Sequence, residues 1–303
     1  MDADRVILVT GASGFLGSRI VQQARCQGLN VVAAHRAGTG PGVAHMDVCD
    51  PNSVDDAIRN AAPTVVIHCA AYGVNYAEQD FQRALHVNTI GAVAVLEAAA
   101  RHGVQRFIHI GSCFEYGSRD GLISENTVLQ PTAVYGATKA AAALLLRERA
   151  RGLKPSLVIL RPFALWGIGE PAHRIIPQVV SACLTGVPLK LTSCEVIRDY
   201  TYVEDMAANI LSIALLPEIE SGTVINLGSG RGVLLRDFVL SVARLLSGEA
   251  LMQFGALPYR PTEMSSLVAD VTRMRSFLGV VRETSLVDGV KRMVESMRTH
   301  NIS

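Results

Sequence analysis

The chain has 303 residues, of which 49% are hydrophobic and 18% are charged, and its formal net charge is +1. A chain of this size can bury a large core, as a compact soluble enzyme does. The near-neutral charge gives no electrostatic reason to expect nucleic acid or a membrane as a partner. The sequence "MDADRVILVTG" lacks a signal-peptide pattern, and no apolar run approaches the roughly 18 residues of a membrane helix.

The six cysteines are scattered along the chain, without a C-x-x-C pair or a cluster of cysteine and histidine. They stand at positions 26, 49, 69, 113, 183 and 194. This distribution favours reduced thiols over a disulfide framework or a zinc site. We therefore expect a cytoplasmic protein that binds no metal.

Through the first half of the chain, short β-branched runs alternate with stretches of helical periodicity. The apolar runs are 5–9, 30–34, 64–69, 106–110 and 156–161, and the clearest helical stretches are 86–101 and 137–150. Continuous apolar strands that alternate with helices are typical of a parallel sheet covered on both faces. The sequence thus predicts an α/β fold with a Rossmann-type, doubly wound parallel sheet.

The second half of the chain loses this alternation and contains prolines at 162, 171, 177 and 188. Such irregularity suits a smaller lobe that shapes a ligand site. We expect a dinucleotide-binding domain over 1–162, with a returning segment near 200–226. The remainder, mainly 163–303, would form the substrate lobe.

A glycine-rich segment, "VILVTGASGFLG", follows the first predicted strand and opens a helix. Gly11, Gly14 and Gly17 would let the backbone approach a pyrophosphate at the helix N-terminus, with Ser13, Phe15 and Leu16 between them. A tight strand-to-helix turn would use the same glycines. The flanking strand and helix favour the cofactor interpretation.

The end of the second strand carries no carboxylate, although NAD-binding folds usually have one there for the ribose 2′-hydroxyl. The chain reads "NVVAAHRAG", so His35 and Arg36 occupy this corner. An arginine pairs well with a 2′-phosphate. We therefore expect NADP(H) as the favoured cofactor, with NAD(H) as the alternative if Arg36 is only a surface residue.

Two further segments are candidates for cofactor contacts. Asp47 and Val48 follow the third apolar stretch and could border the adenine ring, although an aspartate that caps a turn fits equally well. Ala70 and Ala71, in "HCAAYG", end a strand at the expected cofactor edge. Their small side chains would leave room for a dinucleotide.

Tyr135 and Lys139, in "VYGATKAAAALLL", stand four residues apart on a predicted helix and so project from one face. A phenol with a pKa of about 10 is a poor acid–base group at neutral pH. A neighbouring ammonium group stabilises the phenolate and lowers its pKa. This pair is therefore the candidate catalytic unit.

Taken together, these motifs make the chain resemble the extended short-chain dehydrogenase/reductases, the NAD-dependent epimerase/dehydratase family. The matching segments are "TGASGFLG", "IHCAA", "HVNTIG", "GSCFEYG", "YGATK", "LRPFALWG", "IRDYTYVEDMA" and "NLGSG". They run almost from end to end. The resemblance implies an NAD(P)-dependent enzyme that acts on a nucleotide-diphosphate sugar.

The resemblance also implies roles for individual residues. Tyr135 would exchange a proton with the sugar, and Lys139 would hydrogen-bond the nicotinamide ribose and tune Tyr135. Ser112 would hydrogen-bond the same sugar oxygen. Asn88 would support the cofactor side of the site, unless it only caps a helix, and Arg161 would brace the end of its strand.

Residues 113–115 bear on the reaction type. Similar sugar 4,6-dehydratases carry adjacent Asp-Glu after the catalytic Ser or Thr, whereas this chain has Cys113 and Phe114, which would line the sugar instead. A 4,6-dehydratase is therefore disfavoured. Glu115, in an "E-Y-G" ending, and the Arg36 corner resemble features of NADPH-dependent 4-ketosugar reductases. A carboxylate that only hydrogen-bonds a loop fits Glu115 equally well.

These features lead us to expect NADPH-dependent reduction of a nucleotide-diphosphate-linked 4-keto-6-deoxyhexose. The first alternative is a nucleotide-sugar epimerase that keeps NAD(P) tightly bound. The second is a non-enzymatic NADP-binding protein of the same fold, against which the Tyr135–Lys139 pair argues.

By the same resemblance, Arg198 and Arg260 would clamp the substrate diphosphate, since guanidinium groups make bidentate phosphate contacts. Ala164 replaces an asparagine that contacts the substrate in the family. Trp166 is expected to pack in the core, and Arg174 to lie on a surface loop. The Ala-rich helices 86–101 and 137–150 could pair across a homodimer.

Overall fold

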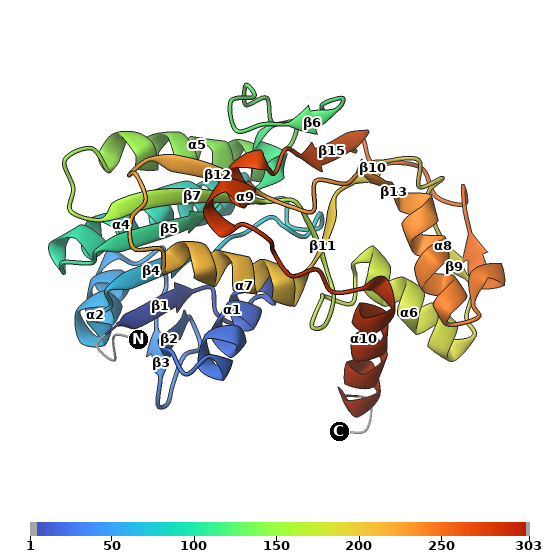
Figure 1. Cartoon of the computed structure of the whole chain (residues 1–303), viewed down its shortest axis with the longest axis horizontal. Coiled ribbons are helices and arrows are strands. Elements are labelled where there is room, and N and C mark those ends of the chain that lie inside the picture. The colour runs from blue at the N-terminus through green and yellow to red at the C-terminus, as the bar shows by residue number, and fades with distance from the viewer. Residues whose placement is uncertain (1–4, 301–303) are drawn as a thin grey trace.

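The computed structural model describes residues 5–300 and contains a central seven-stranded sheet (Figure 1). Its strands are β1 (Val6–Thr10), β2 (Asn30–His35), β3 (Val43–His45), β4 (Val65–His68), β5 (Arg106–Ile110), β7 (Ser156–Pro162) and β12 (Thr223–Leu227). They lie in the order β12-β7-β5-β4-β1-β2-β3, and every pairing is parallel. The predicted α/β fold with a doubly wound parallel sheet is therefore confirmed.

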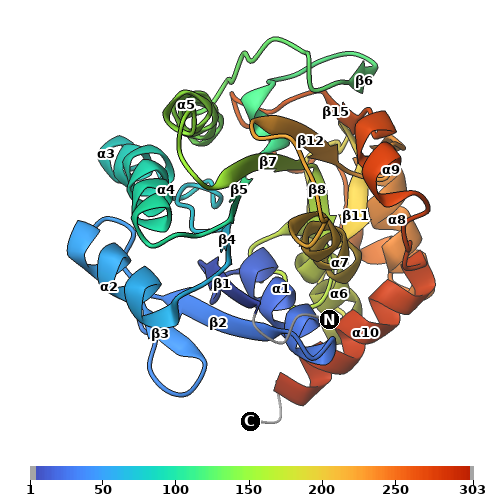
Figure 2. The same ribbon diagram turned by 60° about the vertical axis from the view of Figure 1, so that its left-hand side comes forward.

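Helices cover both faces of this sheet, as Figure 2 shows. One face carries α1 (Phe15–Cys26), α7 (Val203–Ala214) and α9 (Thr272–Leu278); the other carries α2 (Pro51–Ala61), α3 (Phe81–Leu85), α4 (Gly91–Arg101) and α5 (Val134–Arg149). Alternate strand residues supply the two cores: Ile7 and Val9 pack towards α1 and α7, whereas Leu8 and Phe107 pack towards α4 and α5. Both faces of the sheet are covered by helices and buried, which is why its strands are continuous apolar runs in the sequence.

The predicted helix over 86–101 consists of two pieces. A π-helical turn, η1 (His86–Ile90), joins α3 to α4. Wide turns of this kind are rare and frequently occur at functional sites. This turn places Asn88 next to α5.

A smaller lobe lies beside the main sheet, on the right of Figure 1. Its strands and helices are β8 (Ala164–Trp166), β9 (Leu189–Lys190), β10 (Ile197–Arg198), β11 (Tyr200–Tyr202), β13 (Val233–Leu234), β14 (Met252–Gln253), β15 (Ser266–Ala269), α6 (Ile175–Thr185), α8 (Leu235–Leu245) and α10 (Leu286–His300), with a short 3-10 turn η3 (Glu249–Leu251). The 3-10 turn η2 (Cys113–Glu115) follows β5 of the main sheet, and β6 (Leu122–Ile123) comes after it and pairs with β15. Trp166 is 4% exposed and packs edge-on against Tyr202 and Phe238, so its expected core role is confirmed.

The chain crosses between the two lobes more than once. After the β8 segment it returns to the main sheet as α7 and β12, and later as α9. Residues from the second half of the chain therefore complete the main sheet, while β6 from the first half joins the sheet of the smaller lobe. The domain boundary near residue 162 stays a prediction.

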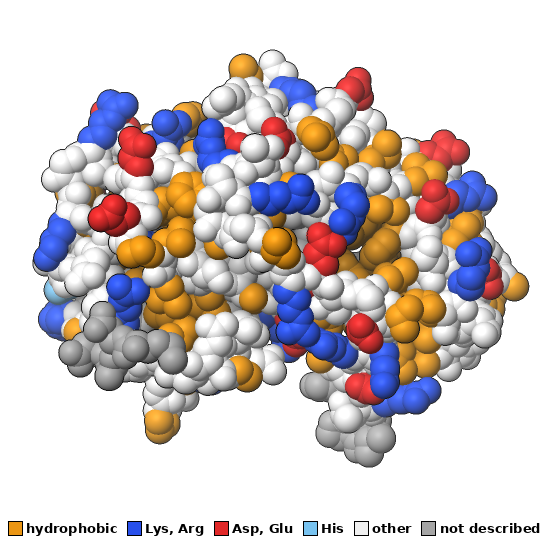
Figure 3. All heavy atoms as spheres, viewed as in Figure 1, with side chains coloured by type: hydrophobic (Ala, Val, Ile, Leu, Met, Phe, Trp, Pro, Cys, Tyr) orange, Lys and Arg blue, Asp and Glu red, His pale blue; other side chains and the backbone are white. Residues whose placement is uncertain are grey.

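The surface shown in Figure 3 intersperses basic and acidic side chains. In residues 5–300, no helix is both long and apolar enough to cross a membrane. Across this same range, no group of histidine, cysteine and acidic residues has the arrangement of a metal site.

Candidate active site

The glycine-rich loop between β1 and α1 forms a close-fitting cradle. Gly11 has a φ of 63°, and a Cβ there would lie 2.7 Å from the backbone nitrogen of Ala70. At Gly17 a Cβ would lie 2.3 Å from the carbonyl oxygen of Gly11. Side chains are thus excluded where strand, loop and helix meet, at the point where the strand order reverses. In open α/β sheets this crevice is the usual ligand site.

The N-terminus of α1 is free to bind an anion. Gly14 is its N-cap residue and no side chain caps the helix. The first-turn N–H groups, beginning at Phe15 and Leu16, and the positive end of the helix dipole suit a pyrophosphate. Ser13 is exposed in the loop. The residues present therefore fit a dinucleotide cofactor.

The corner after β2 is formed by His35, which is half-buried, and Arg36, which is exposed. Nearby, Asp47 Oδ1 accepts a hydrogen bond of 2.9 Å from the backbone N–H of Cys49, so this aspartate caps a turn. Val48 is buried against the main core. Burial raises the pKa of the Cys49 thiol in this turn, and the charge of Arg36 opposes the rise. Arg36 therefore lies near the turn.

Ser112 follows β5 and is the N-cap residue of the η2 turn. Its Oγ accepts a hydrogen bond of 3.2 Å from the N–H of Phe114, and Glu115 Oε1 accepts one of 2.8 Å from the N–H of Ser112. This reciprocal arrangement is a capping box. The hydroxyl group is therefore fixed in place at the C-terminal edge of the sheet.

Tyr135, in the first turn of α5, lies beside this fixed hydroxyl. Burial raises the pKa of Tyr135, and the interaction with the Ser112 hydroxyl opposes the rise. The Phe114 ring stands edge-on to the phenol, with centroids 6.0 Å apart. Burial and the residues of the η2 turn are the largest influences on the pKa of Tyr135, and the tuning role expected of Lys139 stays a prediction.

Lys139 is one helical turn further along α5 and is 1% exposed. Burial lowers the pKa of its ammonium group to about 8, while the carboxylate of Glu115 opposes this change. A lysine in such a site can change protonation state near neutral pH.

Glu115 proves to be part of a buried structural network. Its Oε2 lies 2.8 Å from Nε of Arg161, and the two side chains are 0% and 5% exposed. Arg161 also donates to the hydroxyl of Tyr116 at 2.8 Å, and that hydroxyl donates to Asn226 at 2.7 Å. Arg161 thus braces the end of β7 as expected, and Glu115 holds the Ser112 turn.

Asn88 connects the loop after β4 to α5. Its amide oxygen accepts from the N–H of Tyr72 at 2.8 Å, and its amide nitrogen donates to the Tyr72 carbonyl and to Thr138 Oγ1. Thr138 directly precedes Lys139. The side chain of Asn88 is fully buried and occupied by these bonds, so it positions the helix.

On the side of the smaller lobe, Arg198 pairs with Glu263 at 2.5 Å and is 12% exposed. Its charge also acts on the thiol of Cys113, whose pKa burial raises to about 12. Arg260 is exposed and lies over the ring of Tyr76, 4.3 Å from its centroid. Arg198 is therefore close to the Ser112 turn, whereas Arg260 joins two surface loops. Ala164 is half-buried at the start of β8, paired with Tyr200.

Arg174, which was expected on a surface loop, forms an ion pair near the site with Glu170, a residue that the sequence did not single out. The side chain of Glu170 is 2% exposed, and Arg174 Nε lies 3.2 Å from its Oε1. The guanidinium carbon of Arg174 lies 5.7 Å from the centroid of the Phe15 ring. Burial raises the pKa of Tyr135, and the charge of Arg174 opposes this rise. The i,i+4 spacing of opposite charges was the only available signal in the sequence.

Glu170 should make stability depend on pH. Burial raises its pKa from 4.5 to about 7, so the folded state holds a proton that the unfolded state releases between these values. Its contribution is fully present below pH 4.5 and is lost as the pH rises through 7. Between pH 5 and 8, the free energy of unfolding should fall by on the order of 2 kcal/mol less in Glu170→Gln than in the unmodified protein. Urea unfolding at several pH values measures this, and parallel curves would contradict it.

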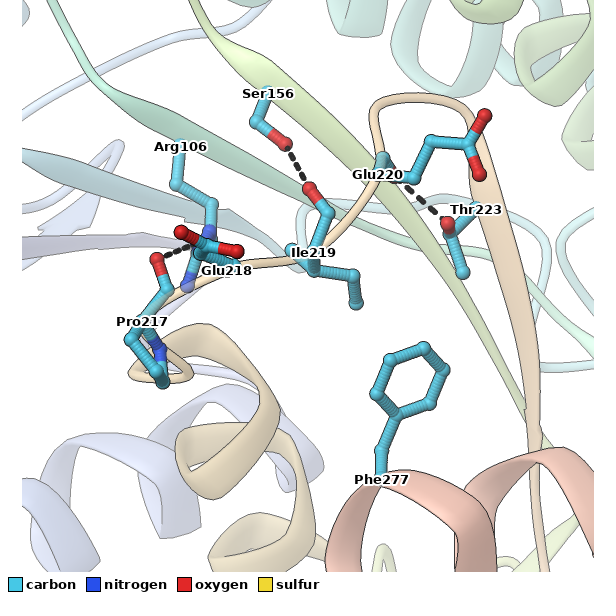
Figure 4. A pocket seen from close by; sticks show the side chains of 8 residues that line it. All are labelled: Arg106, Ser156, Pro217, Glu218, Ile219, Glu220, Thr223 and Phe277. Atoms are coloured by element: carbon cyan, nitrogen blue, oxygen red, sulfur yellow. Dashed lines mark hydrogen bonds between the residues drawn. The ribbon is translucent and has the colours of Figure 1, made fainter.

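An open hollow elsewhere on the surface is drawn in Figure 4. It is lined in part by Arg106, Ser156 and Thr223, the first residues of β5, β7 and β12. It therefore lies at the amino ends of the strands. The Ser112 turn and Tyr135 lie at the opposite, carboxyl edge, where ligands of open α/β sheets bind.

The parallel sheet, the glycine cradle and the Ser112–Tyr135–Lys139 edge define a dinucleotide-dependent enzyme of the short-chain dehydrogenase/reductase class. The family model described as "NAD dependent epimerase/dehydratase family" matches residues 7–228, and the chain belongs to this family.

Relatives match over nearly the whole chain. UDP-glucose 4-epimerase from Rhizobium meliloti (strain 1021) is 26% identical, covering 90% of this chain and 91% of its own. The dTDP-glucose 4,6-dehydratase of Neisseria gonorrhoeae is 26% identical, covering 95% and 94%. The structure of MoeE5 in complex with UDP-glucose and NAD is 31% identical, with a TM-score of 0.86, and the alignment covers 98% and 99% of the two chains.

These relatives refine the expectations from sequence. They are named as epimerases and as a dehydratase, and none of those compared is named as a 4-ketosugar reductase. MoeE5 was solved with NAD, in complexes with UDP-glucose and with UDP-glucuronic acid. The family is therefore confirmed, whereas the preference for NADP(H) and the reductase reaction gain no support.

Proposed function

We propose that this protein is a nucleotide-sugar epimerase that uses a tightly bound NAD(H). The observation that carries this is the juxtaposition of Ser112 and Tyr135 at the crevice edge, in a chain similar over its whole length to UDP-sugar epimerases. Glu115, which had favoured a reductase, is held in a buried ion pair. Cys113 and Phe114 also lack the acid and base that 4,6-elimination needs.

In this proposal the phenolic oxygen of Tyr135 accepts the proton of one sugar hydroxyl and later returns it. The Ser112 hydroxyl, fixed by the η2 capping box, hydrogen-bonds the same sugar oxygen and stabilises developing charge there. Lys139 stabilises the deprotonated phenol when a ribose hydroxyl lies between them. When bound, the nicotinamide would supply the group that accepts a hydride from the sugar and then returns it.

The residues that would hold the dinucleotide are those of the glycine cradle and its neighbours. Gly11, Gly14 and Gly17 would admit the pyrophosphate, with Ser13, Phe15 and Leu16 supplying backbone contacts. Ala70 and Ala71 would line the nicotinamide side. Asp47 and Val48 would border the adenine.

The purified protein provides the first test. An epimerase returns its hydride, so NAD(H) should be released on denaturation, and UDP-glucose or UDP-glucuronic acid should reach an equilibrium with its C4 epimer without added cofactor. NMR of the sugar nucleotides measures the product. Consumption of added NADPH in proportion to product, with no epimer formed, would contradict the proposal.

A reductase is the second candidate, and the exposed Arg36 beside the cradle is the observation that favours it. If Arg36 binds a 2′-phosphate, Arg36→Ala should weaken NADP(H) about tenfold while leaving NAD(H) within about twofold. Fluorescence titration with both reduced cofactors measures this. Tighter binding of NAD(H) than of NADP(H) by the unmodified protein would remove this candidate.

For the diphosphate we propose Arg198 as the principal contact. It faces the Ser112 turn and would exchange its Glu263 partner for phosphate oxygens. Arg260 would contribute from the loop that also lies over Tyr76. The half-buried Ala164 would border the sugar.

We also propose a homodimer through the exposed side of α4 and α5. Leu144 and Leu145 of α5, and Ile90 at the end of η1 just before α4, are each at least half exposed. Exposed apolar side chains gathered on adjoining helices mark contact surfaces. The double variant Leu144→Glu/Leu145→Glu should sediment as a monomer where the unmodified protein sediments as a dimer, and a monomeric unmodified protein would contradict the proposal. The predicted cytoplasmic location stays a prediction.

A further inference from the structure

Two histidines lie side by side inside the main sheet. His68 ends β4 and pairs in register with His109 of β5, and both are 0% exposed. Their rings are stacked, with centroids 5.6 Å apart. They face the same side as Phe107, the side covered by α5.

The hydrogen-bonding capacity of these rings is largely unmet. His68 Nδ1 lies 2.8 Å from Thr10 Oγ1, which also accepts a hydrogen bond from the N–H of Ala70. Within residues 5–300, His68 Nε2 and both ring nitrogens of His109 have no hydrogen-bond partner. Whichever tautomer each ring adopts, buried donors and acceptors remain, and such groups are normally satisfied by protein or by an ordered water.

The ammonium of Lys139 is the charge that acts most strongly on both rings. Phe107 belongs to the same buried cluster as Ala142 and Leu146 of α5, and Lys139 lies about one turn before Ala142 on that helix. Burial, and next the charge of Lys139, lower the pKa of His68 to about 3; the same two causes hold the pKa of His109 well below its usual value. Both rings are therefore neutral, and they can accept a hydrogen bond from a cationic neighbour.

The other titratable and charged groups around Lys139 come from neighbouring elements. Glu115 of η2 and Cys69 after β4 act on the Lys139 ammonium, and Arg161 of β7 acts on His109. Glu115 is already paired with Arg161. None of the ion pairs within residues 5–300 includes Lys139, which leaves its ammonium group open to a neutral hydrogen-bond partner.

We propose that His68 and His109 hold a buried water molecule against the ammonium group of Lys139, and that the histidine pair is a positioning element for this lysine. The water would accept a hydrogen bond from Lys139 and use the free imidazole nitrogens as its remaining partners. A water with three polar partners is stable in a buried site. The catalytic meaning of this element rests on the proposed function, since it acts through Lys139.

A titration of the lysines tests this directly. The chain has only four lysines, at 139, 154, 190 and 291, so ¹³C-labelled lysine gives few NMR signals, and Lys139→Arg assigns the one of interest. His109→Leu should lower the Lys139 midpoint by about one pKa unit, since the ammonium loses its partner. His109→Gln, which keeps polar atoms, should restore most of it. Phe107→Leu, two residues earlier on the same face, is the packing control and should leave the midpoint unchanged.

A crystal structure at near-atomic resolution provides the second readout. Density for one water within hydrogen-bond distance of His68 Nε2, His109 and Lys139 supports the proposal, and its loss in His109→Leu strengthens it. A dry site, a metal ion, or an unchanged midpoint in His109→Leu overturns it. Should that variant fail to fold, the structure of the unmodified protein decides alone. Neither readout uses turnover, so a protein without epimerase activity would refute the proposed function and leave this test intact.

Discussion

Replacing the phenol of Tyr135 with Phe should lower the rate of epimerisation by about 10²- to 10⁴-fold. The variant keeps the aromatic ring that packs edge-on against Phe114, so the helix and the Ser112 turn should stay in place. It loses the phenolic oxygen that we propose exchanges a proton with the sugar beside Ser112. The rate of C4 epimer formation from UDP-glucose or UDP-glucuronic acid, followed by NMR, measures the effect.

The same variant should retain its cofactor. The glycine cradle is built from β1, α1 and Ala70, whereas Tyr135 belongs to α5. Bound NAD(H) per chain, measured after denaturation, should therefore remain within about twofold. Tyr76→Phe is the matched control, because it removes an exposed phenol and keeps the ring under Arg260. A Tyr135→Phe protein with more than about a tenth of the original rate would remove Tyr135 from the mechanism.

The second large effect is expected on stability. Glu115→Ala leaves Arg161 buried without its carboxylate and leaves the N–H of Ser112 without an acceptor. Breaking a buried ion pair by removing one partner typically costs about 3–5 kcal/mol. We expect a loss of this size in the free energy of unfolding, measured by urea denaturation at a single pH.

An exposed ion pair in the same chain supplies the control for this measurement. Glu97 pairs with Arg149 at 2.7 Å, but their side chains are 36% and 54% exposed. Glu97→Ala should cost at most about 1 kcal/mol. The double variant Glu115→Ala/Arg161→Met should be more stable than Glu115→Ala, because it removes the uncompensated charge. If both variants lost the same free energy of unfolding, the buried ion pair would stabilise the fold no more than the exposed one, which would contradict the prediction.

The Glu115 result also bears on how the reaction type is inferred. In the sequence, Glu115 stands among residues that differ between reductases, epimerases and dehydratases, and it favoured reduction. In the fold, its carboxylate faces Arg161 and the backbone of Ser112. A carboxylate held in this way shapes the turn that presents Ser112, and it carries no information on the direction of hydride transfer.

The sequence alone determined the sheet and the candidate catalytic unit, because both depend on local patterns. Continuous apolar runs predicted five of the parallel strands, since a strand buried on both faces must be apolar at every position. The i,i+4 spacing placed Tyr135 and Lys139 on one helix face. The glycine positions followed from the close approach of loop and strand, which leaves no room for a Cβ.

Only the tertiary structure decided which charged and polar groups meet. Glu115 and Arg161 are 46 residues apart in the sequence, and His68 and His109 belong to different strands. Arg174 was expected on a surface loop, but in the fold it pairs with the buried Glu170 and lies over the Phe15 ring. Sequence patterns report local periodicity, whereas burial and pairing depend on how separate strands and helices are brought together. In the fold, burial and Ser112 act first on Tyr135, and the role of Lys139 in tuning this phenol stays a prediction.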